Sequence, residues 1–225
     1  MSKIVIGLPC VGDFPLECLG DLMVSVAEAA MLEDLHIIEP KAIFPHDRAR
    51  EIIITQALSA KCDYLWFIDA DTRQPRGALK EMLRILNEEK AAMVSGYYIQ
   101  RGFPFASTWA IERKIGDVKI ADTMQIVPDD TDRVRIDGCG LGCALIDLNW
   151  IRDNLLAPYF LMTPAPDKPT KYMWEDAFFC VQIQKAKGKI FGLPNIVCMH
   201  MSERRAITPD NAEVLRKEFV ESECV

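Results

Sequence analysis

The segment Asp63-Tyr-Leu-Trp-Phe-Ile-Asp69 constrains the fold of this chain more than any other. Its apolar residues run without polar interruption, which is typical of a strand buried on both faces of a sheet. Apolar runs at residues 3–9, 36–39 and 92–95 have the same character. Because segments with helical spacing of apolar residues separate these runs, the sequence predicts a right-handed, mostly parallel α/β sheet.

Three helices are predicted between these strands, at residues 15–32, from 47 to about 61, and after Pro75. Asp47 is the expected N-cap of the second helix, and Pro75 is expected to open the third. Helices of this kind supply the crossover connections that a parallel sheet requires. The apolar positions whose helical spacing predicts the first helix are Leu16, Leu19, Leu22, Met23, Val26 and Ala30.

The pattern changes after Gly96, where β-hairpins are predicted over residues 105–137, with turns at 114–117 and 128–132. We therefore expect one domain with a parallel N-terminal half and a mixed C-terminal half. The remaining predicted elements are, in order, a strand at 143–146, a short helix near Trp150, an irregular loop at 163–171, a helix at 175–187, strands at 189–193 and 196–200, and a helix at 209–221.

Composition places the chain among ordinary globular proteins. Its 225 residues are 50% apolar and 26% charged, which suits one domain and excludes a disordered chain. The net charge of −7 disfavours binding to nucleic acid phosphates and suits a protein that holds a metal cation. No apolar stretch approaches the ~20 residues of a membrane span, and the N-terminus reads as a buried strand rather than a signal peptide. Eight cysteines without a CxxC pair indicate reduced thiols and a cytoplasmic protein, of the host cytoplasm if the source is a virus.

The clearest predicted strand ends in a pair of carboxylates, Asp69 and Asp71, with Ala70 between them. Ligands of open α/β sheets bind beyond the carboxyl ends of strands, and two carboxylates there repel each other unless a cation or a proton lies between them. A divalent cation that also binds substrate phosphates would remove this repulsion. The alternative is that one aspartate caps the turn before Pro75. A second pair with the same spacing, Asp130-Thr-Asp132, falls in a hydrophilic turn and is expected to be solvated.

Two further positions could contribute to the same site. Trp174-Glu-Asp176 opens a predicted helix, where the acids either complement the helix dipole or hold a carboxylate that takes a proton from an attacking hydroxyl. His200 follows an apolar strand, where it is either a packed side chain or a ligand of a transition metal such as manganese. The residues alone leave both pairs of alternatives open.

The glycines Gly138, Gly140 and Gly142 do not form a dinucleotide-binding fingerprint, because no long helix follows them directly. They suit either a tight turn or a close approach of the backbone to a ligand. Cys139 and Cys143 lack the second pair of Cys or His residues that a structural zinc site requires.

Taken in order, these motifs resemble those of GT-A-fold glycosyltransferases and are similar to the family 2 type. The resemblance covers residues 3 to about 200. One departure is Glu51, where relatives often carry Asn. The motifs that carry the resemblance are Gly-Leu-Pro9, Asp47-Arg-Ala-Arg50, Asp63-Tyr-Leu-Trp-Phe-Ile-Asp-Ala-Asp71, Met93-Val-Ser-Gly96, Asp137-Gly-Cys-Gly140, Trp174-Glu-Asp-Ala-Phe-Phe-Cys180 and His200.

The resemblance implies a single GT-A-like catalytic domain over residues 1–225. It implies an α/β, Rossmann-like fold, with a mostly parallel central sheet, helices on both faces and a mixed β C-terminal half. Within it, residues 1–100 would form the nucleotide-sugar-binding half, 101–200 the acceptor and catalytic half, and 201–225 a C-terminal lid and helix.

The resemblance also implies the activity, which is transfer of a sugar from a UDP- or GDP-sugar to an acceptor hydroxyl. Asp69, Asp71 and His200 would hold Mn²⁺ or Mg²⁺ on the diphosphate. Asp176, with Glu175 as the other possibility, would be the general base, and the anomeric centre would invert. The residues expected on the donor side are Pro9, Cys10, Arg50, Asp69, Ala70, Asp71, Gly138, Gly140, Trp174, Arg204 and Arg205.

Residues 97–136 and 157–173 are expected to shape the acceptor side, and their composition fits a glycan, a protein or a modified nucleobase. Beyond His200, the adjacent residues Arg204 and Arg205 predict that residues 201–209 form a mobile lid that closes on the diphosphate. A solvated arginine pair leading into the last helix is the alternative.

Two other classes of protein are considered. A non-catalytic nucleotide-binding module would differ by failing to hydrolyse a donor. A haloacid-dehalogenase-type phosphatase has a strand similar to Phe-Ile-Asp-Ala-Asp-Thr72, but its nucleophile lies near the chain start and its threonine lies one position further on. Enzymes that synthesise sugar nucleotides share the fold, but Gly7-Leu-Pro-Cys-Val-Gly12 lacks their glycine-rich, arginine-containing loop.

Overall fold

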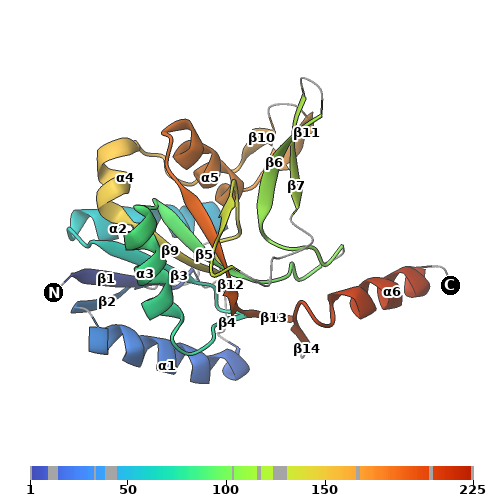
Figure 1. The fold of residues 1–225 in the computed structure, drawn as a ribbon, viewed down its shortest axis with the longest axis horizontal. Helices are drawn as coiled ribbons and strands as arrows, with labels where there is room; N and C mark the ends of the chain where they lie inside the picture. The colour runs from blue at the N-terminus through green and yellow to red at the C-terminus, as the bar shows by residue number, and fades with distance from the viewer. Residues whose placement is uncertain are drawn as a thin grey trace.

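The computed structural model of the chain describes residues 2–9, 15–32, 34–38, 45–102, 104–115, 118–123, 131–165, 168–202 and 205–223. Within these ranges a seven-stranded sheet forms the centre of the molecule (Figure 1). Its strands follow the order β2 (Asp34–Ile38), β1 (Lys3–Gly7), β3 (Tyr64–Ile68), β9 (Cys143–Asp147), β5 (Met93–Tyr97), β12 (Ile190–Val197) and β8 (Val134–Ile136).

Strands β2, β1, β3, β5 and β12 run in one direction, and β9 and β8 run against them. The α/β class with a mostly parallel N-terminal part and a mixed remainder is therefore confirmed. Strand β9 comes late in the chain, yet it lies between β3 and β5. Because β9 is antiparallel to β3, Cys143 pairs with Ile68, and the glycine-rich stretch before β9 lies beside Asp69.

Helices cover both faces of the sheet. On one face lie α1 (Leu16–Leu32) and α3 (Ala78–Glu89), and on the other lie α2 (His46–Ser59), α4 (Leu148–Asn154) and α5 (Glu175–Lys185) (Figure 1). Successive residues of β3 point to opposite faces, so Trp66 and Ile68 pack in one core while Leu65 and Phe67 pack in the other. This explains why β3 is apolar at every position.

Smaller elements surround one end of the sheet. Two hairpins, β6 (Ala110–Ile115) with β7 (Val118–Thr123) and β10 (Thr163–Ala165) with β11 (Lys168–Met173), project from the body (Figure 1). A separate three-stranded sheet contains β4 (Thr72–Arg73), β13 (Met199–Ser202) and β14 (Arg205–Ile207). The last helix, α6 (Ala212–Glu223), extends away from the sheet. No helix in the described ranges is both long and apolar enough to cross a membrane.

The apolar residues whose spacing predicts α1 do not all face the core. Leu16, Leu19 and Met23 are exposed, whereas Cys18, Leu22, Ser25 and Ala29 are buried. The buried positions recur every three or four residues, and several of them are small. This side of α1, which includes Leu22 and Ala29, packs in the same core as α3.

Two predicted helix starts are wrong. The N-cap of α2 is Pro45, and Asp47 lies in the first turn, where its carboxylate accepts hydrogen bonds from the N–H groups of Arg48 and Met162. Helix α3 begins at Ala78 rather than at Pro75, because Gly77 before it adopts the left-handed conformation with φ 78°.

The segment 163–171, predicted to be an irregular loop, is largely the β10–β11 hairpin. Its prolines did not prevent pairing, since a two-stranded hairpin leaves the outer N–H of each strand unused. The two strands predicted at 189–193 and 196–200 are instead the continuous β12, with an irregular register near Pro194, followed by β13. Residues 128–130 of the second predicted turn lie outside the described residues. The division of the domain into functional halves stays a prediction.

Candidate active site

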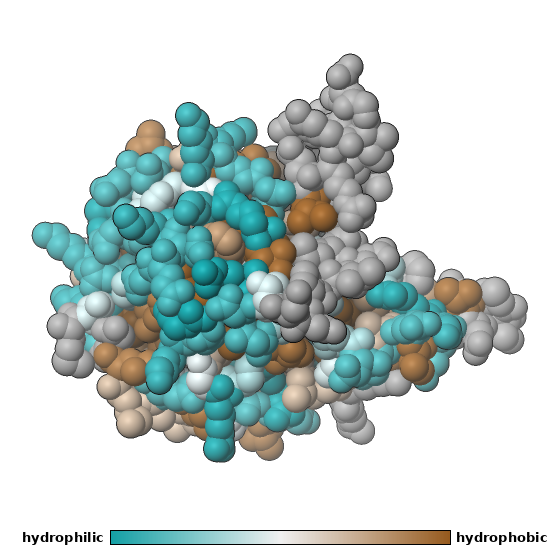
Figure 2. Space-filling model, in the orientation of Figure 1, coloured by the Kyte–Doolittle hydropathy of each residue, from teal (hydrophilic) through white to brown (hydrophobic). Residues whose placement is uncertain are grey.

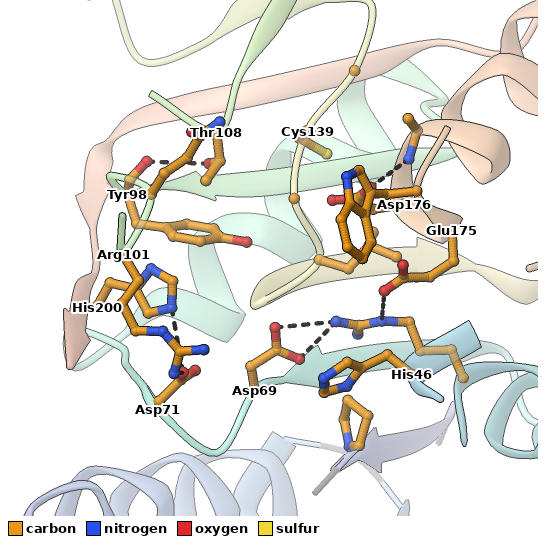
Figure 3. Close-up of a pocket in the computed structure, with 18 of the residues that line it drawn as sticks. His46, Asp69, Asp71, Tyr98, Arg101, Thr108, Cys139, Glu175, Asp176 and His200 are labelled. Carbon is orange, nitrogen blue, oxygen red and sulfur yellow. Dashed lines mark hydrogen bonds and ion pairs between the residues drawn. The ribbon is translucent and has the colours of Figure 1, made fainter. Parts of the chain in front are cut away.

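A cavity of about 790 Å³ lies beyond the carboxyl ends of β3 and β5, at the position where open α/β sheets bind ligands (Figure 3). Pro9, Pro15, Thr108 and Ala110 contribute to its lining, and five parts of the chain supply most of the rest. They are the N-terminal half of α2, the residues that follow β3, the residues that follow β5, the glycine-rich stretch, and the start of α5, with His200 of β13 closing one side.

Arg50 joins two of these parts. Its Nη2 donates to both carboxylate oxygens of Asp69, at 2.9 and 3.1 Å, and its Nε donates to Glu175 Oε1 at 3.3 Å. Arg50 is 4% exposed, and its guanidinium lies over the ring of Phe67. Burial lowers the pKa of Arg50, but the charges of Asp69 and Glu175 more than offset this, and the pKa is raised. Arg50 is therefore a permanent cation that holds the end of β3 against the start of α5.

Asp71 lies on the other side of the cavity. Its Oδ2 is 2.6 Å from Arg101 Nη1 and 3.4 Å from His200 Nε2. The pairing of β4 with β13 places His200 opposite Thr72, and the N–H of Met201 donates to the carbonyl of Asp71. A short sheet outside the main one thus brings the late histidine to the aspartate.

The ionisation of this pair follows from its partners. Burial raises the pKa of Asp71, but the hydrogen bond and charge of His200 and the charge of Arg101 outweigh it, so the pKa is lowered. Burial lowers the pKa of His200, but Asp71 outweighs it, so the pKa is raised. Nδ1 of His200 lies 2.9 Å from the carbonyl of Ile99, which leaves Nε2 facing Asp71. Nε2 can hold a proton for Asp71 or, without one, can be a metal ligand.

The three predicted metal ligands do not converge on one point. Asp69 turns to Arg50, whereas Asp71 turns to His200. Among the residues that the structure describes, no three His, Cys, Asp or Glu side chains come together as a metal site. Asp71 and His200 still offer an oxygen and a nitrogen at one place, a donor pair that suits Mn²⁺, whereas Mg²⁺ would use the carboxylate oxygen. The chemistry therefore fits a cation at Asp71 and His200 and does not fit one at Asp69.

Asp176 lies at the first turn of α5, next to Glu175. Trp174, the N-cap of the helix, makes no side-chain capping bond and is largely exposed at the cavity. Burial and then the charge of Glu175 raise the pKa of Asp176 to about 6. A carboxylate with such a pKa can accept a proton near neutral pH, as a general base requires.

The backbone of the glycine-rich stretch packs closely against the side chain of Tyr98. A Cβ at Gly140 would overlap the hydroxyl of Tyr98, and a Cβ at Gly142 would lie 2.8 Å from Thr72 Oγ1 and 3.0 Å from the same hydroxyl. Gly138, by contrast, has room for a Cβ. Tyr98 thus requires a glycine at position 140, and Thr72 and Tyr98 together require one at position 142.

Most of the predicted site residues meet in this one cavity. Those that line it are Pro9, Arg50, Asp69, Ala70, Asp71, Gly138, Gly140, Trp174, Glu175, Asp176 and His200. Cys10, Arg204 and the side chain of Arg205 lie outside the described residues. The segment predicted to be a lid contains the paired strand β14, and its closing on a diphosphate stays a prediction.

Tyr98 and Arg101 line the cavity but were missed by the sequence reasoning. Both follow β5, so polar residues after the apolar run at 92–95 were the available signal. Glu51, the departure from the related family, has a structural partner, because its Oε2 accepts from the N–H groups of Tyr159 and Phe160 at 2.9 and 2.8 Å.

The second aspartate pair behaves as expected where it is described. Asp132 is partly exposed, and its Oδ2 lies 2.7 Å from Nη2 of Arg84. Neither residue lines the cavity. Asp130 lies outside the described residues. Spacing alone therefore does not distinguish the two pairs, whereas position at a strand end does.

Fold and cavity together define an α/β protein with an acidic pocket at the carboxyl ends of its strands. No protein-family model and no curated protein matches the sequence. Among solved structures, the chain is similar to A197 from STIV, known from a crystal structure, with a TM-score of 0.64 and 19% sequence identity. The similarity covers 93% of this chain and 91% of A197. At this identity the likeness shows a shared fold.

Proposed function

We propose that this protein is a GT-A-type glycosyltransferase that moves a sugar from a UDP- or GDP-sugar to an acceptor hydroxyl with inversion. The observation that carries the proposal is the arrangement of charge in one cavity. Arg101, Asp71 and His200 line one side, and Asp176 and Glu175 line another (Figure 3). An inverting transfer needs this separation, because the leaving diphosphate and the attacking hydroxyl lie on opposite faces of the sugar.

The diphosphate side supplies positive charge. Asp71 and His200 are the residues that would hold Mn²⁺ or Mg²⁺, which when bound stabilises the negative charge on a departing diphosphate. Arg101, which is largely exposed and reaches Asp71 from the loop after β5, can donate to phosphate oxygens. These residues together would offset the charge that develops as the bond between sugar and diphosphate breaks.

The opposite side supplies the base. In the proposed reaction a carboxylate oxygen of Asp176 takes the proton of the acceptor hydroxyl, and the acceptor's oxygen forms the new bond to the anomeric carbon. The bond between that carbon and the diphosphate oxygen breaks at the same time, and the nucleoside diphosphate leaves. Glu175 is less suited to this role, because its Oε1 accepts a hydrogen bond from Arg50. Arg50 instead fixes Glu175, and with it the start of α5, relative to Asp69.

The phosphatase alternative requires a free aspartate nucleophile at the end of β3. Both oxygens of Asp69 accept hydrogen bonds from Arg50, which lowers their reactivity toward a phosphoryl group. The donor-hydrolysis assay below distinguishes an enzyme from a non-catalytic nucleotide-binding module.

A screen of UDP-glucose, UDP-galactose, UDP-N-acetylglucosamine and GDP-mannose tests the proposal. Each is incubated with the protein and Mn²⁺, and thermal shift and release of UDP or GDP are measured. We expect one donor to stabilise the wild type and to be hydrolysed slowly. Asp71→Asn should lose both effects, and Asp132→Asn, from the solvated pair, should retain both. If no donor binds or is cleaved, the proposed function is wrong; binding without cleavage, also in the presence of sugar acceptors, would favour the non-catalytic module.

A further inference from the structure

We propose that Tyr98 determines which sugar the site accepts, by donating a hydrogen bond from its phenolic O–H to a hydroxyl oxygen of the transferred sugar. This inference rests on the proposed function and adds to it a residue that contacts the sugar itself. The sequence reasoning did not single out Tyr98.

The position of Tyr98 suits this role. It directly follows β5, is 4% exposed and lines the cavity. Figure 3 shows its hydroxyl pointing into the space between Asp71 and His200 on one side and Asp176 on the other. In a displacement reaction the transferred sugar lies between the leaving group and the attacking hydroxyl. Tyr98 therefore points to where the sugar would lie.

The hydrogen bonds of the phenol are incomplete. A tyrosine hydroxyl can donate one hydrogen bond and accept others. The oxygen of Tyr98 accepts from the N–H of Gly142 at 2.8 Å. Its own hydrogen has no acceptor within the described part of the chain. Burying a hydrogen-bond donor without an acceptor costs free energy. An oxygen of a bound ligand would accept this hydrogen bond and remove the cost.

The surrounding structure fixes the hydroxyl in place. The ring contacts His200 edge to face, with the ring centres 5.6 Å apart, and the backbone carbonyl accepts from both N and Oγ1 of Thr108 at 3.1 Å. Because Gly140 and Gly142 have no Cβ, they leave space for the hydroxyl of Tyr98. A Cβ at either position would take up part of this space. A donor held in this way loses little entropy on binding and can discriminate between ligands.

The chemistry of the group favours a sugar over a phosphate. The phenol of a tyrosine is neutral at neutral pH and keeps the proton that it donates. The cationic groups that suit a diphosphate, Arg101 and His200, pair with Asp71, whereas the hydroxyl of Tyr98 lies beside Gly142. A neutral donor matches a neutral sugar hydroxyl.

The test compares the wild type with Tyr98→Phe, which keeps the ring and removes only the hydroxyl. Calorimetry measures binding of the donor found in the screen above, from the four nucleotide sugars named there, and of its 2-, 3-, 4- and 6-deoxy analogues, all with Mn²⁺. We expect the wild type to bind one deoxy analogue about 10-fold more weakly than the parent donor, and Tyr98→Phe to bind the two alike. Tyr64→Phe, which removes a hydroxyl bonded to Asn87 away from the cavity, should discriminate like the wild type.

A purely structural role of Tyr98 would give a different pattern. If Tyr98→Phe weakens every donor equally and keeps the discrimination among deoxy analogues, the inference is overturned. It is also overturned if the wild type binds all deoxy analogues as well as the parent. These outcomes leave donor binding intact, so they are distinct from failure of the proposed function, in which the wild type binds no nucleotide sugar at all.

Discussion

Nη2 of Arg50 donates to both carboxylate oxygens of Asp69, at 2.9 and 3.1 Å, while Nε of the same side chain reaches Glu175. One buried cation therefore links the end of β3 to the start of α5. The face of the molecule seen in Figure 2 is largely hydrophilic, with apolar side chains gathered in smaller areas. The ion pairs of Arg50 with Asp69 and Glu175 are buried, and solvent ions screen buried charges weakly.

Loss of this cation should destabilise the protein strongly. Arg50→Met would leave Asp69 and Glu175 facing each other without compensation, and breaking a buried ion pair from one side costs about 3–5 kcal/mol. We expect the free energy of unfolding from urea titration at pH 7 to fall by this amount. Arg84→Met, at a surface cluster of acids, should change it little.

The pH dependence of Arg50→Met gives the check. The deficit should shrink as the pH falls toward about 4, where carboxylates take up protons and the repulsion disappears. Adding Glu175→Gln to Arg50→Met should recover part of the stability at pH 7. A deficit that is independent of pH would mean that lost packing over Phe67, rather than charge, is its cause.

Asp176→Asn should reduce turnover by ~10²- to 10⁴-fold while donor affinity is retained. In the wild type, kcat should rise as the pH increases through about 6, because only the deprotonated carboxylate of Asp176 can accept the proton. The residual activity of Asp176→Asn should lack this rise. If Asp176→Asn turns over normally and Glu175→Gln is inactive, the base is Glu175.

The same substitution should stabilise the fold above pH 6. The native pKa of Asp176, about 6, exceeds the value near 4 of an unfolded chain, so the native state binds this proton more tightly. Native stability is thus reduced as the pH rises from about 4 to 6 and stays reduced above. Asp176→Asn removes the effect and should raise the free energy of unfolding at pH 8 by about 1–3 kcal/mol, with no gain at pH 4. An equal gain at both pH values would contradict the assignment.

Mn²⁺ should bind weakly to the protein alone and tightly only together with UDP or GDP. Asp71 and His200 provide only two ligands, and the guanidinium of Arg101 already pairs with Asp71. Calorimetry should show that Asp71→Asn loses metal-dependent nucleotide binding and that His200→Ala weakens it less. Arg101→Met should increase the affinity for Mn²⁺ alone several-fold, because it removes a competing cation. If Asp71→Asn binds Mn²⁺ and nucleotide like the wild type, the metal assignment is wrong.

The sequence predicted the strands of the parallel half well, because β3 and its neighbours are buried on both faces and leave long apolar runs. It could not predict that β9 enters between β3 and β5, since that depends on pairing between residues far apart in the chain. The convergence of Asp71 and His200 depends on the β4–β13 pairing, and β4 is two residues long. Such a short pairing leaves no periodic pattern. The resemblance to a known family, rather than spacing, brought these residues together.

The partners of individual residues were predicted less well than their location. Arg50 was expected to face a nucleotide, which stays a prediction. In the structure it lines the cavity and pairs with Asp69 and Glu175, because a buried guanidinium requires paired acids. For Gly140 and Gly142 the sequence left two interpretations, a tight turn or a close approach of the backbone to a ligand. In the structure both glycines lie against the hydroxyl of Tyr98. Partner identity depends on tertiary contacts, which a single sequence does not encode locally.

The glycine-rich stretch allows a final test of how Tyr98 is accommodated. Gly140→Ala would place a Cβ against the hydroxyl of Tyr98, and overpacking of this kind costs about 1–3 kcal/mol. Gly138→Ala, whose nearest neighbours would lie at 3.7 and 3.9 Å, should be nearly neutral in the same urea titration.

Combining each glycine substitution with Tyr98→Phe distinguishes the constraint at Gly140 from the constraint at Gly142. Tyr98→Phe removes the hydroxyl oxygen that the methyl group introduced by Gly140→Ala would overlap. Gly140→Ala with Tyr98→Phe should therefore recover most of the lost stability relative to Tyr98→Phe alone. Gly142→Ala should recover less, because its Cβ would still lie 2.8 Å from Thr72 Oγ1. Equal recovery at both positions would mean that the stretch moves as a unit, and that Tyr98 does not dictate these glycines one by one.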